Sequence, residues 1–446
     1  MLDVLTERER TGAYSNILIK KALDRGEELT PHQRSFIKRL AEGTIERQME
    51  LDSVIGRCLK SPDQKMKPAV RCLLRMSIYQ IYYMDSVPDH AACNEAVRIL
   101  KKRHIDHAAG FVNAVLRRVC REKEASKEAS NDISAEDRYS MPEFIVRMWE
   151  EAYGSKETED LLAALLEPRP VCIRLDERYP RELQEKTVAG LRDLGVEVEP
   201  GRWLACCRRL KKIGMPVAKL PGFAQGLYTV QDESSMLAVE ALGIAPSSSG
   251  AGTVIYDLCA SPGGKSMHIA SKAPKARVFA YDLTRARTDL IRRNARRMKC
   301  DNLTVKEWDA ETFDPSRFES ADYVLCDLPC SGLGVTGRKQ DIKYNVTEAK
   351  IASLVSLQKR ILKTAVRYVK PGGVLVYSTC TIDRAENEKM ADYIEQKLGM
   401  KKSPLAPYLP EGLLEGQEKD AARLQLLPNR HDTDGFFMAR FTKPAP

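Results

Sequence analysis

Two cysteines in the C-terminal half of the chain lie where a thiol could act as a nucleophile. Cys330 follows Pro329 shortly after an apolar run that ends at Asp327, and Cys380 ends a second apolar run that begins at Val374. A cysteine at the end of a strand gains thiolate character from nearby backbone amides and cations, and the thiolate is the reactive form. A thiolate that adds to carbon 6 of a cytosine makes carbon 5 nucleophilic enough to accept a methyl group. A second thiol beside it could then help to remove the proton from carbon 5.

Carboxylates end or closely follow the same kind of apolar run, at Asp257, Asp282, Asp309 and Asp327. In a parallel sheet, ligands bind outside the carboxyl ends of the strands, so these groups are expected at one edge. A carboxylate at the end of the second strand can accept hydrogen bonds from both hydroxyls of a ribose. Carboxylates at three successive strand ends suit S-adenosylmethionine, whose ribose, adenine amine and sulfonium carry donors or positive charge. We therefore predict a site for this cofactor.

Two glycine-rich motifs in this region fail as nucleotide-binding signatures. The segment 257–266 resembles a phosphate-binding loop, but Cys259 occupies the position of its first glycine. The segment 332–337 fits the dinucleotide pattern, but residues 338–345 after it have no helical apolar face. Neither a nucleoside triphosphatase nor a dinucleotide-binding enzyme is therefore indicated.

The elements that must position these residues alternate between strand and helix. Such alternation predicts a Rossmann-like, doubly wound parallel sheet over residues 253–443. Strands are expected at Val254–Ala260, Arg277–Asp282, Leu303–Asp309, Ala321–Asp327 and Val374–Cys380, and helices at Met267–Lys272, Arg285–Lys299 and Glu348–Val369.

The preceding half of the chain predicts two further domains. Residues 1–125 have helical apolar periodicity throughout, and 126–138 form a charged linker. Residues 139–245 indicate a small α+β domain, with strands at Val171–Leu175, Val196–Val198 and Trp203–Ala205. The fold class is therefore multidomain: an all-α bundle, a small α+β domain and an α/β Rossmann-like domain.

Composition excludes several classes of protein. The chain has 446 residues, 43% of them hydrophobic, which excludes global disorder and a disulfide miniprotein. We find no apolar run of transmembrane length and no signal peptide, so a cytoplasmic protein without a membrane partner is expected. The twelve cysteines include no C-x-x-C pair, and no metal ion is expected.

The net charge of +9 favours a polyanionic partner. Basic residues are dense in two segments. Residues 285–299 hold seven basic residues against one Asp, and residues 202–212 hold five. Both clusters suit either an RNA path or a solvated surface.

The C-terminal region resembles the Sun superfamily of RNA cytosine-5 methyltransferases. Cys-Ala-Ser-Pro-Gly-Gly-Lys at 259–265 is similar to the family's cofactor loop, with Ser261 where alanine is usual, and segments 386–388 and 431–437 also match. The resemblance implies Cys380 as nucleophile, Cys330 as the residue that assists release, and Asp327 as the contact to the base. DNA cytosine methyltransferases use the Pro-Cys position as nucleophile, so this division of roles rests on the resemblance. It implies S-adenosylmethionine binding by Cys259, Ala260, Ser261, Pro262, Gly263, Gly264, Lys265, Asp282, Arg287, Asp309 and Asp327.

The N-terminal region is similar to the NusB-like domain, through Ala13–Asn16, Val87–Ala96 and Ala109–Arg117. This combination implies a monomer that methylates one cytosine of 16S ribosomal RNA, as free RNA or in an assembling subunit. The alternatives are a transfer RNA methyltransferase and a non-catalytic RNA-binding assembly or antitermination factor. The chain departs from the family, in ways that bear on the base pocket, at Leu328, Gly337, Gln340 and Tyr344.

Overall fold

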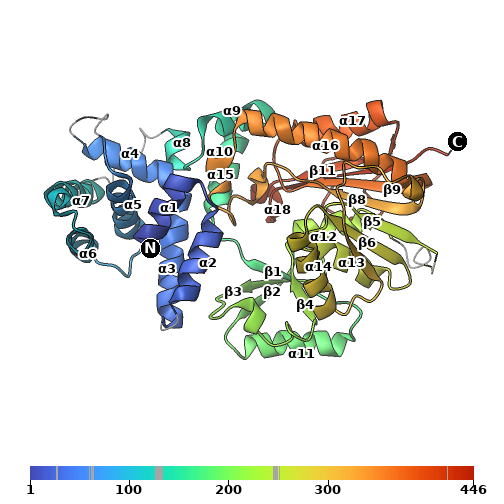
Figure 1. The fold of residues 1–446 in the computed structure, drawn as a ribbon, viewed down its shortest axis with the longest axis horizontal. Coiled ribbons are helices and arrows are strands. Elements are labelled where there is room, and N and C mark those ends of the chain that lie inside the picture. Colours follow the sequence, from blue (N-terminus) through green and yellow to red (C-terminus); the bar gives the residue numbers. More distant parts are fainter. Residues whose placement is uncertain are drawn as a thin grey trace. The chain divides into compact units, whose positions relative to one another are not determined.

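The computed structural model describes residues 1–26, 29–59, 61, 65–125, 134–244, 250, 252–418 and 420–445. The chain divides into two compact units. The first comprises Met1–Leu166 with Arg338–Asn345, and the second comprises Glu167–Gly337 with Val346–Pro446. Figure 1 shows helices throughout the first unit and the β-strands in the second. Most of the expected linker, residues 126–133, lies outside the described residues.

The first unit is a helical bundle built around α5. Leu73, Leu74 and Ile78 of this helix are fully buried, and α5 packs against α1, α3, α4, α6 and α7. No helix among the described residues is both long and apolar enough to span a bilayer. The helices are α1 (Leu2–Thr11), α2 (Ser15–Arg25), α3 (Pro31–Glu46), α4 (Gln48–Cys58), α5 (Pro68–Tyr83), α6 (Asp89–Lys102), α7 (Ala109–Ala125), α8 (Ala135–Arg138), α9 (Glu143–Tyr153) and α10 (Ser155–Leu166).

The first unit extends beyond the boundary expected at residue 139. Ser140 accepts a hydrogen bond from the backbone amide of Glu50 through its hydroxyl, at 2.9 Å, and α9 and α10 group with the bundle. The segment Arg338–Asn345, which contains α15 (Ile342–Asn345), also belongs here. The Asp341 carboxylate accepts from the Ser15 amide at 2.6 Å, and the Tyr344 hydroxyl donates to the Glu46 carbonyl at 3.0 Å.

The second unit contains a small antiparallel sheet in the order β2-β3-β1-β4. The strand expected at Trp203–Ala205 is wrong: the Glu233 carboxylate accepts from the amides of Arg202, Trp203 and Leu204 at 2.7–3.0 Å, so these amides are unavailable to a neighbouring strand. The elements are β1 (Val171–Leu175), α11 (Arg181–Arg192), β2 (Glu197–Pro200), β3 (Cys207–Lys211), β4 (Tyr228–Val230) and α12 (Glu233–Glu240).

The larger sheet has the order β10-β12-β9-β8-β5-β6-β7, with β11 on β12. The five strands β5 to β9 are parallel, which confirms the predicted Rossmann-like core, whereas β12 runs antiparallel to β9 and makes the sheet mixed. The strands are β5 (Val254–Asp257), β6 (Arg277–Asp282), β7 (Leu303–Glu307), β8 (Ala321–Asp327), β9 (Val369–Thr379), β10 (Lys401–Lys402), β11 (Arg423–Leu426) and β12 (Phe436–Thr442). The helices are α13 (Gly264–Lys272), α14 (Arg285–Arg297), α16 (Glu348–Tyr368), α17 (Glu388–Leu398) and α18 (Pro428–His431).

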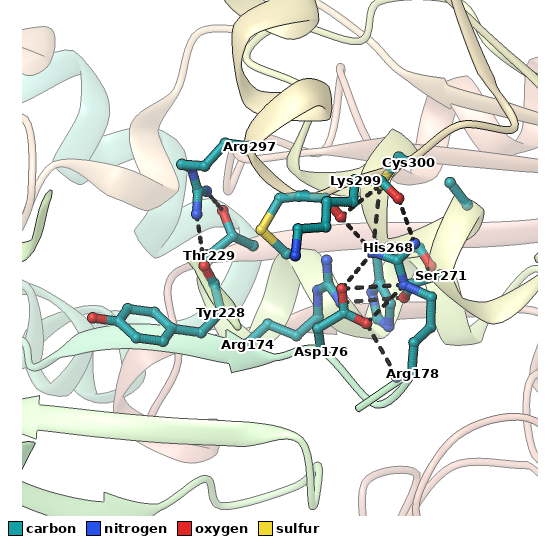
Figure 2. A network of polar contacts seen from close by, with 12 residues as sticks. Arg174, Asp176, Arg178, Tyr228, Thr229, His268, Ser271, Arg297, Lys299 and Cys300 are labelled. Carbon is teal, nitrogen blue, oxygen red and sulfur yellow. Dashed lines mark hydrogen bonds and ion pairs between the residues drawn. The ribbon is translucent and has the colours of Figure 1, made fainter. Parts of the chain in front are cut away.

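Arginine side chains join the small sheet to the helices of the larger one (Figure 2). Arg297 of α14 donates to the carbonyls of Phe223 and Tyr228 at 2.8 and 2.9 Å. In the other direction, Arg178 donates to the carbonyls of Met298 and Lys299 at the end of α14. Because these bonds satisfy main-chain carbonyls on both sides, the two sheets form one unit.

Candidate active site

The carboxyl ends of the parallel strands bring the predicted acidic residues to one edge of the sheet. Asp257, Asp282 and Asp327 are the last residues of β5, β6 and β8. The third strand of the sequence, β7, ends two residues before Asp309, which is exposed and accepts from the Glu311 amide at 2.9 Å. Asp309 thus caps its own turn, while the others point to the edge where ligands bind in such sheets.

The two predicted thiols are in contact. Cys330 Sγ lies 3.4 Å from Cys380 Sγ, and both residues are partly exposed. The hydrogen bond to Cys380, reinforced by burial, raises the pKa of Cys330 well above its ordinary value. Cys330 is therefore the protonated partner of the pair, and it can donate to a negative charge on Cys380.

A lysine and a carboxylate lie beside the thiols. Lys265 Nζ is 2.6 Å from Asp327 Oδ2, and the Ser378 hydroxyl donates to Asp327 Oδ1 at 2.9 Å. Burial lowers the pKa of Lys265, but the charge and hydrogen bond of Asp327 outweigh it, with a further contribution from Cys380, so the pKa is raised. This ammonium group is thus placed to favour negative charge on the Cys380 sulfur.

The predicted cofactor loop, residues 259–265, is held against Asp282. One oxygen of this carboxylate accepts from the Ser261 amide at 2.9 Å, and the other accepts from the Leu283 amide at 2.8 Å and from Arg287 at 3.3 Å. A carboxylate has about four acceptor positions, so roughly one is left. Asp282 can accept hydrogen bonds from both hydroxyls of a ribose only if Arg287 no longer donates to Asp282 Oδ1.

Glycine is required where the loop enters α13. Gly263 caps this helix with a φ of 103°, a conformation that strains any residue with a side chain. A Cβ atom there would also lie 3.1 Å from Ile291 of α14. Asn294 of α14 donates to the carbonyl of Pro262 at 3.0 Å, so α14 supports the loop from the side.

Asp257 supplies a buried acceptor under the loop. Its Oδ2 accepts from the Ser266 hydroxyl at 2.5 Å, while Oδ1 is buried without a hydrogen-bond partner among the described residues. Burial raises the pKa of Asp257 to about 7. An unsatisfied buried oxygen is costly, which is the signature expected where a ligand completes the bonding.

The sequence did not identify the residues that hold the loops of Cys330 and Cys380, which follow β8 and β9. Glu386, in the segment 386–388 that matched the family, is fully buried, and its carboxylate accepts from the Ser331 amide and from Gln358. The match at 386–388 was the only signal, because nothing local in the sequence shows which loops a buried carboxylate will reach.

The four departures from the family pattern lie in different places. Leu328 is buried in the core of the larger sheet, and Gly337 is the last residue before the segment that joins the first unit. Gln340 and Tyr344 lie within that segment, and Tyr344 hydrogen-bonds inside the helical bundle.

Among the described residues, one cluster offers atoms that could hold a metal ion. Glu177, Cys206 and His268 place a carboxylate, a thiol and an imidazole within 4.8 Å of one another. Burial, together with the charges of Arg174 and Lys272, keeps the pKa of His268 well below its ordinary value. These two cations would also repel a metal ion, so we assign no metal to this cluster.

The parallel sheet, the glycine-containing loop after its first strand and the acidic strand ends define a Rossmann-like methyltransferase core, joined in one chain to a helical bundle. The family model described as 16S rRNA methyltransferase RsmB/F matches residues 245–442, and the NusB family model matches residues 1–121. The chain belongs to the RsmB/F methyltransferase family and carries an N-terminal NusB family domain, which confirms the resemblance seen in the sequence.

Relatives with the same name align along the full chain. A probable ribosomal RNA small subunit methyltransferase B of Bacillus subtilis is 35% identical, over 99% of this chain and 97% of the relative. A probable ribosomal RNA small subunit methyltransferase B of Synechocystis is 32% identical, over 99% of this chain and 98% of the relative.

Solved structures share the fold. The structure of PH0851 covers 99% of this chain and 97% of its own, with a TM-score of 0.78 and 24% identity. NSun6 from Pyrococcus horikoshii with SFG covers 68% of this chain and 99% of its own, with a TM-score of 0.59 and 21% identity.

Proposed function

We propose that this protein methylates carbon 5 of a specific cytosine in 16S ribosomal RNA, with S-adenosylmethionine as the methyl donor. The observation that carries the proposal is the pair of thiols 3.4 Å apart, at the strand edge that also holds Lys265 and Asp327. The family of the chain and the names of its relatives support the substrate class.

Cys380 is the nucleophile in this proposal. Its thiolate, favoured by Lys265 and by the donor Cys330, forms a bond to carbon 6, and the electron pair of the 5,6 double bond becomes available at carbon 5. Asp327 hydrogen-bonds the base ring and holds it over the thiols. After carbon 5 is methylated, its proton passes to water, the 5,6 double bond returns and the bond from sulfur to carbon 6 breaks, which releases the Cys380 thiolate. Cys330 assists this elimination as the protonated thiol that donates to the departing sulfur.

The residues present suit S-adenosylmethionine. The free oxygen of Asp257 and the remaining acceptor of Asp282 fit a molecule with an amino group and ribose hydroxyls, while Ser261 and Gly263 shape the loop around it. When bound, the cofactor supplies a methyl group on a positively charged sulfur. The acidic strand ends favour that charge.

The target cytosine has to leave its stack before carbon 6 can reach a thiol, as in other base-modifying enzymes. The surrounding strand must therefore be held by its phosphates. Arg293 and Arg296 of α14 are exposed and have no ion pair among the described residues, and their helix supports the cofactor loop. In the cluster 202–212, Arg209, Lys211 and Lys212 pair with Asp432, Glu199 and Glu197, and Arg208 donates to main-chain carbonyls. The support that α14 gives to the cofactor loop favours this helix as part of the RNA path.

Bisulfite sequencing of ribosomal and transfer RNA tests the proposal. A strain that lacks the gene should lose one 5-methylcytosine from 16S RNA, and the wild-type chain but not Cys380→Ser should restore it. Loss of a methylated cytosine from transfer RNA alone would support that alternative substrate. Unchanged methylation of both RNAs, with no cofactor binding by calorimetry, would favour a non-catalytic RNA-binding factor.

A further inference from the structure

The two thiols lie on separate loops, and neither strand alone fixes their separation. Cys330 lies between Pro329 and Ser331 in the loop after β8, and Cys380 lies between Thr379 and Thr381 after β9. A shift of about 1 Å in either loop is large on the scale of a hydrogen bond and of catalytic geometry. The separation of the thiols therefore depends on the contacts that hold each loop.

The first loop is held on both sides of Cys330. Gln358 of α16 donates through Nε2 to the Pro329 carbonyl at 2.9 Å and to Glu386 Oε1 at 3.0 Å. On the other side, the Ser331 amide donates to Glu386 Oε1 at 3.0 Å, and the Ser331 hydroxyl donates to Glu386 Oε2. Glu386 and Gln358 thus fix the residues before and after the thiol.

The second loop is held on both sides of Cys380 by the neighbour of Glu386. Asn387 accepts through Oδ1 from the Thr379 hydroxyl at 2.6 Å and donates through Nδ2 to the Thr381 carbonyl at 3.0 Å. The two loops are also joined directly, since the hydroxyls of Ser331 and Thr381 lie 2.6 Å apart.

We propose that Glu386 is a positioning residue that, with Asn387, holds the Cys330 and Cys380 thiols at contact distance for the reaction. This inference rests on the proposed function only in naming the two thiols as catalytic. A carboxylate suits the position because it accepts from an amide, a hydroxyl and a carboxamide at once, whereas glutamine would present one donor among these donors.

The environment of Glu386 is costly for a purely structural residue. Glu386 is fully buried and forms no ion pair among the described residues, so its charge is balanced only by neutral hydrogen-bond donors. Burial raises its pKa to about 7, and its charge is one of the influences that raise the pKa of Cys330. The same carboxylate thereby helps to keep Cys330 protonated.

Disulfide formation measures the separation of the thiols without requiring catalysis. Diamide removes two electrons and two protons from Cys330 and Cys380, becomes the hydrazine, and leaves a sulfur–sulfur bond. Cys93 and Cys120 of the helical bundle, with sulfurs 3.9 Å apart, provide a reference pair in the same molecule. Both disulfides can be quantified by mass spectrometry of peptides from the full-length protein.

The test compares Glu386→Gln with Asp392→Asn, which neutralises a half-exposed carboxylate of α17 that pairs with Arg423. Because loss of the Glu386 charge also makes Cys330 easier to ionise, the rates are compared per thiolate. On that scale we expect the Cys330–Cys380 disulfide to form about tenfold more slowly in Glu386→Gln, the size of effect given by one misplaced hydrogen bond to a charged group. The Cys93–Cys120 rate and both rates in Asp392→Asn should be unchanged. In methylation assays, kcat should fall while KM for the cofactor stays the same.

Ser331→Ala is the second variant in case Glu386→Gln does not fold. This substitution removes the hydroxyl that contacts both Glu386 and Thr381, but it keeps the hydrogen bond from the main-chain amide of residue 331 to the Glu386 carboxylate. A smaller slowing of the same disulfide is therefore expected. The inference would be overturned if Glu386→Gln, or Ser331→Ala in its place, formed the disulfide at the wild-type rate. That result would leave the proposed methylation intact, because Cys380→Ser tests it separately.

Discussion

At the scale of single residues, charge determines what the site can do. Lys265 pairs with Asp327 and feels the charge of Cys380, and the hydrogen bond to Cys380 raises the pKa of Cys330. The positions of Asp327 and Cys380 at or next to strand ends could be predicted from the sequence because apolar runs mark where each strand stops. The contacts of Glu386 could not, since they join loops that are far apart in sequence.

Asp257 gives a pH prediction for cofactor binding. Its pKa is raised to about 7 in the folded protein, so the carboxyl is protonated below that pH and ionised above it. If the free oxygen accepts from the cofactor's amino group, affinity should rise with pH through 7 and weaken by up to about tenfold for each unit below it. Calorimetry with S-adenosylmethionine between pH 5.5 and 8 checks this. Asp257→Asn should bind weakly with a flat profile, and a flat wild-type profile would contradict the role of Asp257.

Lys265→Met should impair catalysis more than cofactor binding. The substitution keeps the bulk of the side chain but removes the charge that lies 2.6 Å from Asp327 and favours a thiolate on Cys380. We expect kcat to fall by about 10²-fold or more, as for loss of a charge that stabilises a reacting group. Alkylation by iodoacetamide at neutral pH should also slow at Cys380. Unchanged alkylation would show that Lys265 does not activate this thiol.

At the scale of elements, α14 links the cofactor loop, the small sheet and the solvent. Asn294 supports the loop, Arg297 binds carbonyls of the small sheet, and Arg293 and Arg296 face water. The helix itself could be predicted from its apolar spacing. Which of its cations remain unpaired could not, because pairing depends on carboxylates brought near by the fold.

Reversing the free cations of α14 should weaken RNA binding in a salt-dependent way. For Arg293→Glu combined with Arg296→Glu, the slope of log K against log salt should decrease by about 0.7 for each lost phosphate contact with single-stranded RNA. Filter binding of 16S RNA at several salt concentrations measures the slope. Lys211→Glu combined with Lys212→Glu is the matched control, because both lysines already pair with glutamates. Equal effects of the two double variants would argue against a specific role for α14.

At the scale of the whole molecule, two segments group with the helical unit although their place in the sequence suggested otherwise. Residues 338–345 follow the Cys330 loop in sequence but pack in the helical unit, and α9 and α10 join that unit as well. Composition marks loops and linkers, and the short segment 338–345 lacks the apolar periodicity that would have assigned it. The parallel core and the N-terminal bundle could be predicted because both have long periodic patterns.

Tyr344→Ala should therefore destabilise the helical unit, although the residue lies in the C-terminal half of the sequence. The Tyr344 hydroxyl donates to Glu46, and Arg8 lies over the ring at 5.3 Å from its centroid. We expect a loss of about 2 kcal/mol, less than the roughly 3–5 kcal/mol of a fully buried aromatic ring, because Tyr344 is only partly buried. Hydrogen exchange by peptide should show faster exchange in α1 and α3. Faster exchange confined to peptides of the methyltransferase sheet would contradict the assignment of this segment.

The most direct test of the central claim is the fate of RNA bound to Cys330→Ala. With cofactor and 16S RNA present, Cys380 should still attack carbon 6, but the elimination that Cys330 assists should stall. We predict a covalent protein–RNA adduct that survives denaturing electrophoresis and is absent from Cys380→Ser and from the double variant. Normal turnover by Cys330→Ala without an adduct, or an adduct that persists in Cys380→Ser, would contradict the assigned roles of the two thiols.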